Sequence, residues 1–337
     1  MRGITIGIPA YNGRKTLERA LDSALSQTIR LPYEILIVDD GSADTSANIA
    51  LSYALMFPSL VRLIRTPNRG VAAARNTIVA NALYDHLTWL DADDVYGPEK
   101  LELQYDALML SNALAHLAPA NPYMMLFSPF YLNSVIYSFD RYLSDPITHI
   151  LSGDFRAYLW ASLTATESYR RVGPFNETLH RSEDTDWLLR FIMSGGELTT
   201  TTGKPLMEYQ FSTDRDGARV EYSFRYMLEV YGAEMKQRGL YEEFVPRRYW
   251  EISNFYHRNK RWKDMWRCRA MAAALDPERF RERLETELRA LKDPEQQLGI
   301  RQFCKSVSCA NAPVRSDKIK PRAAGGAEEV NEETASA

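Results

Sequence analysis

An Asp-rich turn follows a short apolar run at residues 87–90. The turn reads Asp91-Ala92-Asp93-Asp94. In an extended segment alternate side chains share one face, so Asp91 and Asp93 can hold one hard divalent cation between them. Such a cation would neutralise a diphosphate leaving group. The alternative is an ordinary turn, because Asp is favoured in turns and helix caps.

Two further loops carry groups suited to a nucleoside. Pro9-Ala10-Tyr11-Asn12 follows one β-branched run, and Asp39-Asp40-Gly41-Ser42 follows another. A Tyr ring can stack on a nucleobase, and an Asp carboxylate can accept a hydrogen bond from an imide N–H or a ribose hydroxyl. Taken singly, each loop is also compatible with a turn. The prediction of a site therefore depends on the three loops meeting at one edge.

The first hundred residues alternate apolar β-type runs with helical spacing of apolar residues. This pattern predicts strands at 4–8, 34–38, 61–65 and 87–90, and helices at 16–27, 43–56 and 70–81. We expect Pro9 to end the first strand. Alternation of this kind predicts an α/β fold with a doubly wound, mostly parallel sheet. Ligands of such sheets bind at the carboxyl ends of the strands, which is where the three loops lie.

The composition is that of a globular protein. The chain has 337 residues, 41 Lys and Arg against 44 Asp and Glu, and 3 cysteines. The near-neutral charge gives no reason to expect a nucleic-acid partner, and the cysteines are too few for a disulfide framework or zinc site. The N-terminal apolar run is too short for a secretory signal, and no apolar run reaches the length of a bilayer span. We expect a soluble, cytoplasmic protein.

Several sequence segments resemble family 2 glycosyltransferases of the GT-A fold. The resemblance lies in the runs IPAYNGRKTLERALDSALSQT, YEILIVDDGSADTS, TPNRGVAAARN, LTWLDADDVYGPEKLELQ, YRRVGPFNE and SEDTDWLLR, in the family's order. It covers roughly residues 3–215. The resemblance implies inverting transfer of a sugar from a nucleoside diphosphate sugar, with UDP as the default nucleotide and Mn2+ or Mg2+ as cofactor. Glycans, lipid-linked sugars or proteins are the expected acceptors.

The resemblance also assigns donor-side roles. Pro9, Ala10 and Tyr11, with Asn12 beside them, would line the nucleobase pocket. The remaining donor residues would be Asp40 facing the base, Asp39 bracing its loop, Asn68, Gly70 and Arg75 closing over the nucleoside, and Asp91 toward the ribose. The metal would lie on Asp93 with Asp91, and Asp94 is an alternative ligand. Arg75 has a second interpretation, as a salt bridge on a helix surface.

The run Glu183-Asp184-Thr185-Asp186-Trp187 resembles the family's catalytic motif. Inversion needs a base that deprotonates the acceptor hydroxyl opposite the leaving group. The resemblance gives this role to Asp184, with Glu183 orienting the base or the acceptor. Asp186 and Trp187 would contact the acceptor, with the indole against a sugar ring. The alternative is that these acids begin a helix and interact with its dipole.

One expected feature is missing. Many relatives carry a His-containing loop after the catalytic motif, and residues 209–217 contain no His. Arg215 is a possible replacement that would contact the diphosphate, and Asp214 a possible metal ligand.

Helical spacing with closely alternating aromatic and basic residues marks residues 216–303. These residues form either a helical subdomain with an aromatic core, or a surface for a membrane or a second copy of the chain. The predicted organisation is a glycosyltransferase domain at 1–215 (a nucleotide-sugar half to residue 100, then an acceptor half), this helical subdomain, and a disordered tail at 304–337. Two other functions remain open: a sugar-phosphate nucleotidyltransferase, and an inactive nucleotide-sugar-binding module.

Overall fold

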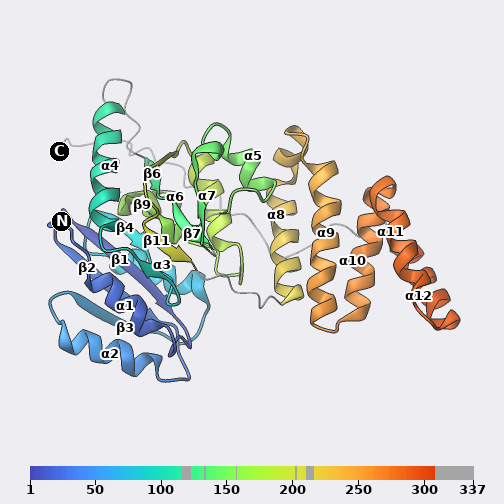
Figure 1. Cartoon of the computed structure of the whole chain (residues 1–337), viewed down its shortest axis with the longest axis horizontal. Coiled ribbons are helices and arrows are strands. Elements are labelled where there is room, and N and C mark those ends of the chain that lie inside the picture. The colour runs from blue at the N-terminus through green and yellow to red at the C-terminus, as the bar shows by residue number, and fades with distance from the viewer. Residues whose placement is uncertain (116–122, 133, 157, 202, 210–215, 308–337) are drawn as a thin grey trace, which may run out of the picture.

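The computed structural model describes residues 1–307 except 116–122, 133, 157, 202 and 210–215 (Figure 1). The strands are β1 Ile4–Ala10, β2 Tyr33–Asp39, β3 Val61–Arg65, β4 His86–Trp89, β5 Val95–Tyr96, β6 Met124–Phe127, β7 Phe130–Leu132, β8 Val135–Tyr137, β9 Ser162–Ala165, β10 Glu197–Thr200 and β11 Met207–Tyr209. The α-helices are α1 Leu17–Leu25, α2 Ser46–Met56, α3 Val71–Asn81, α4 Lys100–Ala115, α5 Pro146–Leu151, α6 Thr166–Val172, α7 Glu183–Met193, α8 Gly217–Gln237, α9 Tyr241–Arg258, α10 Trp262–Leu275, α11 Pro277–Arg289 and α12 Pro294–Ser306.

The central sheet has the strand order β10-β6-β9-β4-β1-β2-β3. Strands β1, β2, β3 and β4 pair in parallel with one another, which confirms the predicted mostly parallel α/β sheet. Strand β9 is the exception, because it runs antiparallel to both β4 and β6. The strands near the middle are buried on both faces, as continuous apolar runs of parallel sheets require.

The first strand continues through Pro9 to Ala10, although we expected Pro9 to end it. The carbonyl of Ala10 accepts a hydrogen bond from the Asp40 amide, so the backbone polar groups of Ala10 point toward β2 and those of Pro9 point toward β4. Pairing with β4 has already ended at Gly7. Proline has no N–H, and at Pro9 β4 no longer offers a carbonyl that would accept a hydrogen bond from one. The strand can therefore continue through Pro9.

The remaining strands form a small sheet with the order β5-β11-β7-β8. Its first strand begins one residue after Asp94, so the Asp-rich turn joins the two sheets. The sequence between about residues 101 and 186 shows no clear secondary-structure pattern, and the structure places α4, α5, α6 and β6–β9 there.

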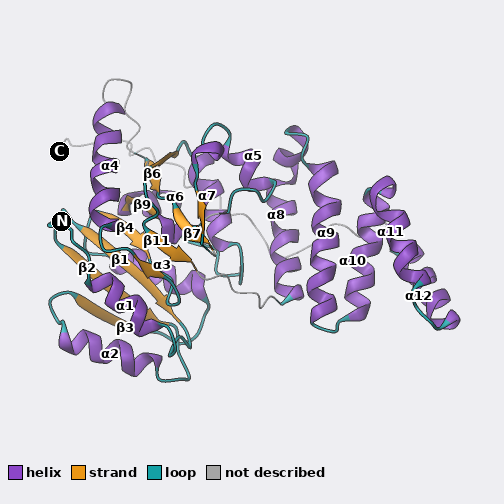
Figure 2. Ribbon diagram, in the orientation of Figure 1, coloured by secondary structure: helices purple, strands orange, loops and turns teal. Residues whose placement is uncertain are grey.

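The C-terminal helices stack side by side, and Figure 2 separates this all-helical part from the part that contains the sheets. Helix α8 packs on α9, α9 on α10, and α10 on α11. Four of the eight Phe, Tyr and Trp residues of α9 and α10 are buried: Tyr249, Trp250, Tyr256 and Trp266. Only Trp262 among the tryptophans here is half exposed. These four aromatic residues thus belong to a core, as expected for a helical subdomain.

A buried ionic network holds this stack together. Glu221 of α8 accepts hydrogen bonds at 2.6 Å from Tyr256 of α9 and from both terminal nitrogens of Arg267 of α10. Burial favours the neutral form of this carboxyl group, but Arg267 and Tyr256 outweigh it and lower the pKa of Glu221. One carboxylate therefore fixes the relative positions of three helices.

The ends of the helical part differ slightly from the prediction. Asp216 caps α8 by accepting from the Ala218 amide, close to the predicted boundary. Helix α12 continues to Ser306, so the tail does not begin at 304 as predicted. Residues 308–337 lie outside the described residues. No helix in the described part of the chain is long and apolar enough to cross a membrane.

We expect Glu221→Gln to lower the free energy of unfolding by about 2–3 kcal/mol at pH 7, because Arg267 loses its charged partner. The folded-state pKa of Glu221 lies below its ordinary value of 4.5, so this stabilisation is complete above pH 4.5 and disappears as pH falls through the folded pKa. Urea unfolding of both proteins at several pH values measures this. A difference that persists unchanged in acid would contradict the ionic role.

Candidate active site

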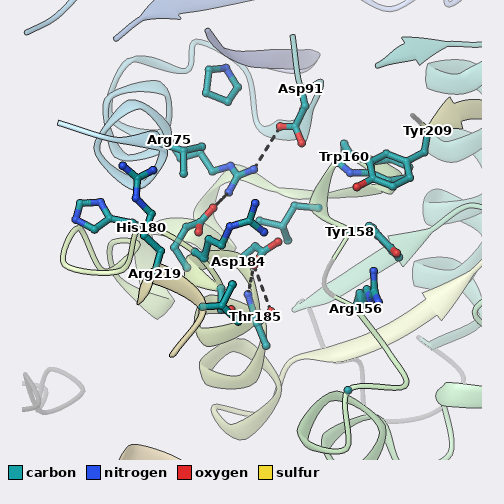
Figure 3. Close-up of a pocket in the computed structure, with 18 of the residues that line it drawn as sticks. Arg75, Asp91, Arg156, Tyr158, Trp160, His180, Asp184, Thr185, Tyr209 and Arg219 are labelled. Atoms are coloured by element: carbon teal, nitrogen blue, oxygen red, sulfur yellow. Dashed lines mark hydrogen bonds and ion pairs between the residues drawn. The ribbon is translucent and has the colours of Figure 1, made fainter. Parts of the chain in front are cut away.

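A large cavity of about 1120 Å3 opens at the carboxyl edge of the central sheet. Residues following β1 and β4 line one side, the first turn of α7 lies in the middle, and α8 and α9 contribute another wall. Two of the three loops predicted from sequence, those after β1 and β4, therefore line the same cavity, and the loop at residues 39–42 does not. In Figure 3, Arg75 lies between Asp91 and the region of Asp184, and Arg156, Tyr158, Trp160 and Tyr209 lie to the right.

Arg75 of α3 is the buried cation of this site. One guanidinium nitrogen pairs with Glu183, and another lies 3.3 Å from Asp91 Oδ1. Only 5% of the residue is exposed. Burial opposes its charge, but the carboxylates of Glu183, Asp91 and Asp184 outweigh that effect and raise the pKa of Arg75. Arg75 is therefore no surface salt bridge, since it joins the strand-end acid to the predicted catalytic motif.

The predicted catalytic pair begins helix α7. Ser182, just before the helix, has a left-handed backbone with φ 63°, and Glu183 and Asp184 occupy the first turn. Asp184 accepts from the amide of Thr185 at 2.7 Å and lines the cavity. Burial raises the pKa of Asp184 above its usual range, although Arg75 and the Thr185 donors oppose the shift. Burial and the adjacent Asp184 raise the pKa of Glu183 as well. The two interpretations of this motif are therefore compatible, because Glu183 and Asp184 both begin helix α7 and line the cavity.

The Asp-rich turn separates its three acids. Asp91 and Asp93 line the cavity, with the latter exposed. Partial burial and the Asp91 carboxylate raise the pKa of Asp93. Asp94 is 1% exposed and does not line the cavity, so its predicted role as an alternative metal ligand is wrong. The turn reverses direction before Asp94 and points it into the protein.

Two cavity carboxylates fit a metal that is shared with a substrate. Within the described ranges, no group of three or more His, Cys, Asp or Glu side chains is placed to hold an ion. Mg2+ is commonly held by one or two carboxylates together with substrate phosphates. Asp91 and Asp93 supply that donor set. Arg215 and Asp214, the predicted replacements for the missing His, lie outside the described residues.

The loops after β1 and β2 are tied together. The Asn12 amide donates to Ser42 Oγ at 2.9 Å, and Asn12 Oδ1 accepts from the Ala43 amide at 2.8 Å. Pro9, Tyr11 and Asn12 line the cavity, and the Tyr11 side chain is open to it with 53% of the residue exposed. Ala10 is buried at the end of β1. A nucleobase could therefore reach Tyr11.

Behind this surface, Asp39 and Asp40 are buried and organise the loops. Asp40 accepts from the backbone amides of Arg69 and Gly70 at 3.0 and 2.8 Å. Asp39 accepts from Arg65 Nε at 3.1 Å, which agrees with a bracing role. Asp40 does not face an open pocket as we expected, because both its oxygens are already used by the loop. Asn68 and Gly70 also lie outside the cavity lining, as part of the loop that Asp40 holds.

The structure corrects the predicted acceptor contacts. Trp187 is fully buried and stacks on Tyr169 with ring centroids 4.3 Å apart, so it cannot meet a sugar ring. Asp186 is buried too, and accepts from Tyr226 and Tyr231 of α8 at 3.1 and 2.8 Å. Both residues lie on the inner face of α7, whereas Asp184 lies on the cavity side.

Three aromatic residues that we had not predicted line the cavity instead. Trp160 and Tyr209 stack with centroids 4.9 Å apart, and Tyr158 lies 5.1 Å from Trp160 (Figure 3). Tyr209 is the one of these three that is not buried, so its face can pack against a sugar ring, whereas Tyr158 and Trp160 are 8% and 4% exposed and support it from behind. The pattern Tyr158-x-Trp160 was visible in the sequence, but it gave no signal that distinguished it from core aromatics.

Residues 5–162 match the sequence model of the family described as "Glycosyl transferase family 2". The chain is 39% identical over 105 residues to an uncharacterized glycosyltransferase of Rickettsia prowazekii, which covers 31% of each chain. It is 33% identical over 191 residues to the chondroitin synthase of Escherichia coli, which covers 56% of this chain and 26% of that enzyme. The chain thus spans about a third or less of the curated relatives it matches.

Crystal structures of S. aureus TarS residues 1–349 share the fold. The structure in complex with UDP aligns with a TM-score of 0.57 at 17% identity, and covers 91% of this chain and 89% of that chain. The alignment covers more of the chain than residues 5–162, so the fold likeness includes much of the helical part.

We expect the double variant Tyr226→Phe/Tyr231→Phe to loosen helix α7, because Asp186 would lose both hydroxyl donors from α8. Each such hydrogen bond to a charged group contributes about 1.5–3 kcal/mol. Amide hydrogen exchange of residues 183–187 and urea unfolding measure the loss. Tyr222→Phe, on an exposed position of the same helix, is the matched control. Equal protection in all three proteins would show that this contact does not hold α7.

Proposed function

We propose that this chain transfers a sugar from a nucleoside diphosphate sugar to an acceptor hydroxyl, with inversion at the anomeric carbon. The observation that carries the proposal is the buried Arg75, which holds Asp91 on one side and the Glu183–Asp184 pair on the other. This arrangement puts a strand-end acid suited to a donor and a carboxylate suited to a base in one cavity. The family assignment of residues 5–162 supports the same reaction class.

Asp184 is the proposed general base. Its carboxylate lines the cavity, and its raised pKa makes it a better proton acceptor than an exposed Asp would be. The Thr185 amide and hydroxyl fix one of its oxygens at 2.7 and 3.2 Å. The other oxygen is left to accept the proton of the acceptor hydroxyl as that hydroxyl attacks the anomeric carbon. Glu183, paired with Arg75, positions this helix turn.

Tyr11 and the loop at residues 9–12 are the proposed nucleobase contacts, and Asp91 the ribose contact. Asp93 and Asp91 would hold a divalent metal, Mn2+ or Mg2+, which when bound stabilises the charge of the departing diphosphate. TarS structures with UDP and with UDP-GlcNAc support a UDP-sugar as the first donor to test. The chondroitin synthase relative supports polysaccharide synthesis as the context.

A screen of nucleoside diphosphates and their sugars by thermal shift, with and without Mn2+, tests donor binding. We expect UDP with Mn2+ to raise the Tm most. A different nucleotide giving the largest shift would change the donor and leave the reaction class standing. No shift with any nucleotide would overturn the proposal.

Asp184→Asn should reduce sugar transfer by roughly 100-fold or more, since general base catalysis contributes about that much. Nucleotide affinity should stay near that of the unaltered protein. Because the pKa of Asp184 is raised, transfer by the unaltered protein should fall as pH drops through that pKa. Asp44→Asn is the control, since it removes a negative charge from the same cavity at a position that is not on α7. Full transfer by Asp184→Asn would refute the assignment of the base.

Asp93→Ala should weaken nucleotide binding in the presence of Mn2+ but change it little without the metal. Isothermal titration with UDP under both conditions separates the two cases. A loss of equal size with and without Mn2+ would mean that Asp93 contacts the nucleotide itself and does not bind a metal.

A further inference from the structure

One wall of the cavity is cationic, and the donor contacts proposed above do not use it. The wall consists of Arg156, Arg181, Arg219, Arg247 and Arg248. We propose that this arginine wall binds the acceptor, and that the acceptor is a glycan carrying anionic groups, either carboxylates or phosphodiesters. The inference rests on the proposed transferase function and adds the chemical class of the acceptor.

The arginine wall has an excess of positive charge. Glu251 is the only acid among the cavity-lining residues of α8 and α9 in the described chain. It lies 2.9 Å from Arg248 and 3.8 Å from Arg247, so one carboxylate is shared between two arginines. Arg219 is 3.8 Å from Asp216, and both side chains are more than half exposed. Exposed pairs of this kind contribute little, so the guanidinium of Arg219 stays available to a ligand.

Arg247 is fixed in place before any ligand arrives. Its Nη2 donates to the Ser152 carbonyl at 3.1 Å, and its guanidinium lies 5.5 Å from the centre of the Phe244 ring. Its Nε is buried and donates no hydrogen bond within the described residues. A planar guanidinium held this way is suited to a carboxylate or phosphate.

The wall also offers surface for a sugar chain. Phe224, Met227 and Phe244 line the cavity beside the arginines. Apolar side chains suit the faces of sugar rings, whereas a small free anion would need only the charges. The combination therefore fits an anionic glycan better than an inorganic ion.

The position of the wall assigns it to the acceptor and not to the donor. In Figure 3, Arg219 and Arg156 lie on either side of Asp184, while Asp91 lies across Arg75 from it. The donor side has its own cations, because Arg14 and Lys15 line the cavity next to Tyr11. The residue that would deprotonate the acceptor is thus flanked by the arginine wall.

Binding of labelled oligosaccharides to the full chain, measured by fluorescence anisotropy, tests the proposal. The probes are an oligogalacturonate, an oligo(glycerol phosphate) and a neutral malto-oligosaccharide of matched length. We expect at least one anionic probe to bind more tightly than the neutral one, and added salt to weaken it. Whichever of the two anionic probes binds with higher affinity shows whether the recognised group is a carboxylate or a phosphodiester.

The wall variant is Arg219→Gln/Arg248→Gln, and the matched control is Arg281→Gln/Arg289→Gln on the exposed face of α11. We expect the wall variant to lose about tenfold or more in affinity for the anionic probe, and the control to lose little. Equal affinity of the unaltered protein for neutral and anionic probes would overturn the proposal. An equal loss in both variants would also overturn it.

UDP affinity, measured on the same samples, separates this inference from the proposed function. UDP binding that is intact in the wall variant, together with loss of the anionic probe, supports an acceptor role. If the unaltered protein failed to bind any nucleotide, the transferase proposal would fail, whatever the wall binds. If UDP affinity fell together with that of the probe, the wall would belong to the donor site and this inference would be wrong.

Discussion

The site depends on one buried cation. Arg75 and Glu183 are 108 residues apart in sequence, and their ion pair joins helix α3 to the helix that carries Asp184. A buried arginine without partners would be very costly, and so would the acids around it. Each group is tolerated only because the others are present. The same balance keeps Asp91 and the start of α7 at a fixed separation across the cavity.

The helical part is joined to this centre and is more than an appendage. Asp186 and Asp184 lie in the same turn of α7, but Asp186 faces α8 and accepts from two of its tyrosines. Ser223 of α8 also donates to the carbonyl of Arg181, just before α7. Helix α8 is in turn fixed to α9 and α10 through Glu221. The stack therefore both supports the proposed base and supplies a wall of its cavity.

Local patterns were sufficient for the first hundred residues. Strand β3 has the bounds predicted for it, and the neighbouring elements differ by a few residues at their ends. Patterning succeeded there because parallel strands are continuous apolar runs and each is followed by an amphipathic or Ala-rich helix. Patterning was uninformative between about residues 101 and 186, where short strands pair with partners that are distant in sequence. Strand β9, for example, lies between β4 and β6, and no local signal specifies that pairing.

Residue types and their order along the chain indicated the proposed reaction class and the candidate acids, because carboxylates suit both a divalent cation and a general base wherever they lie in the fold. Tertiary structure decided which carboxylates face the cavity. Asp94, Asp186 and Trp187 looked as suitable as their neighbours, yet packing turns each of them inward. It also brought Trp160, Arg219 and Arg248 to the same cavity from distant elements. The direction of a side chain is set by the elements packed around it, and a single sequence does not encode those contacts locally.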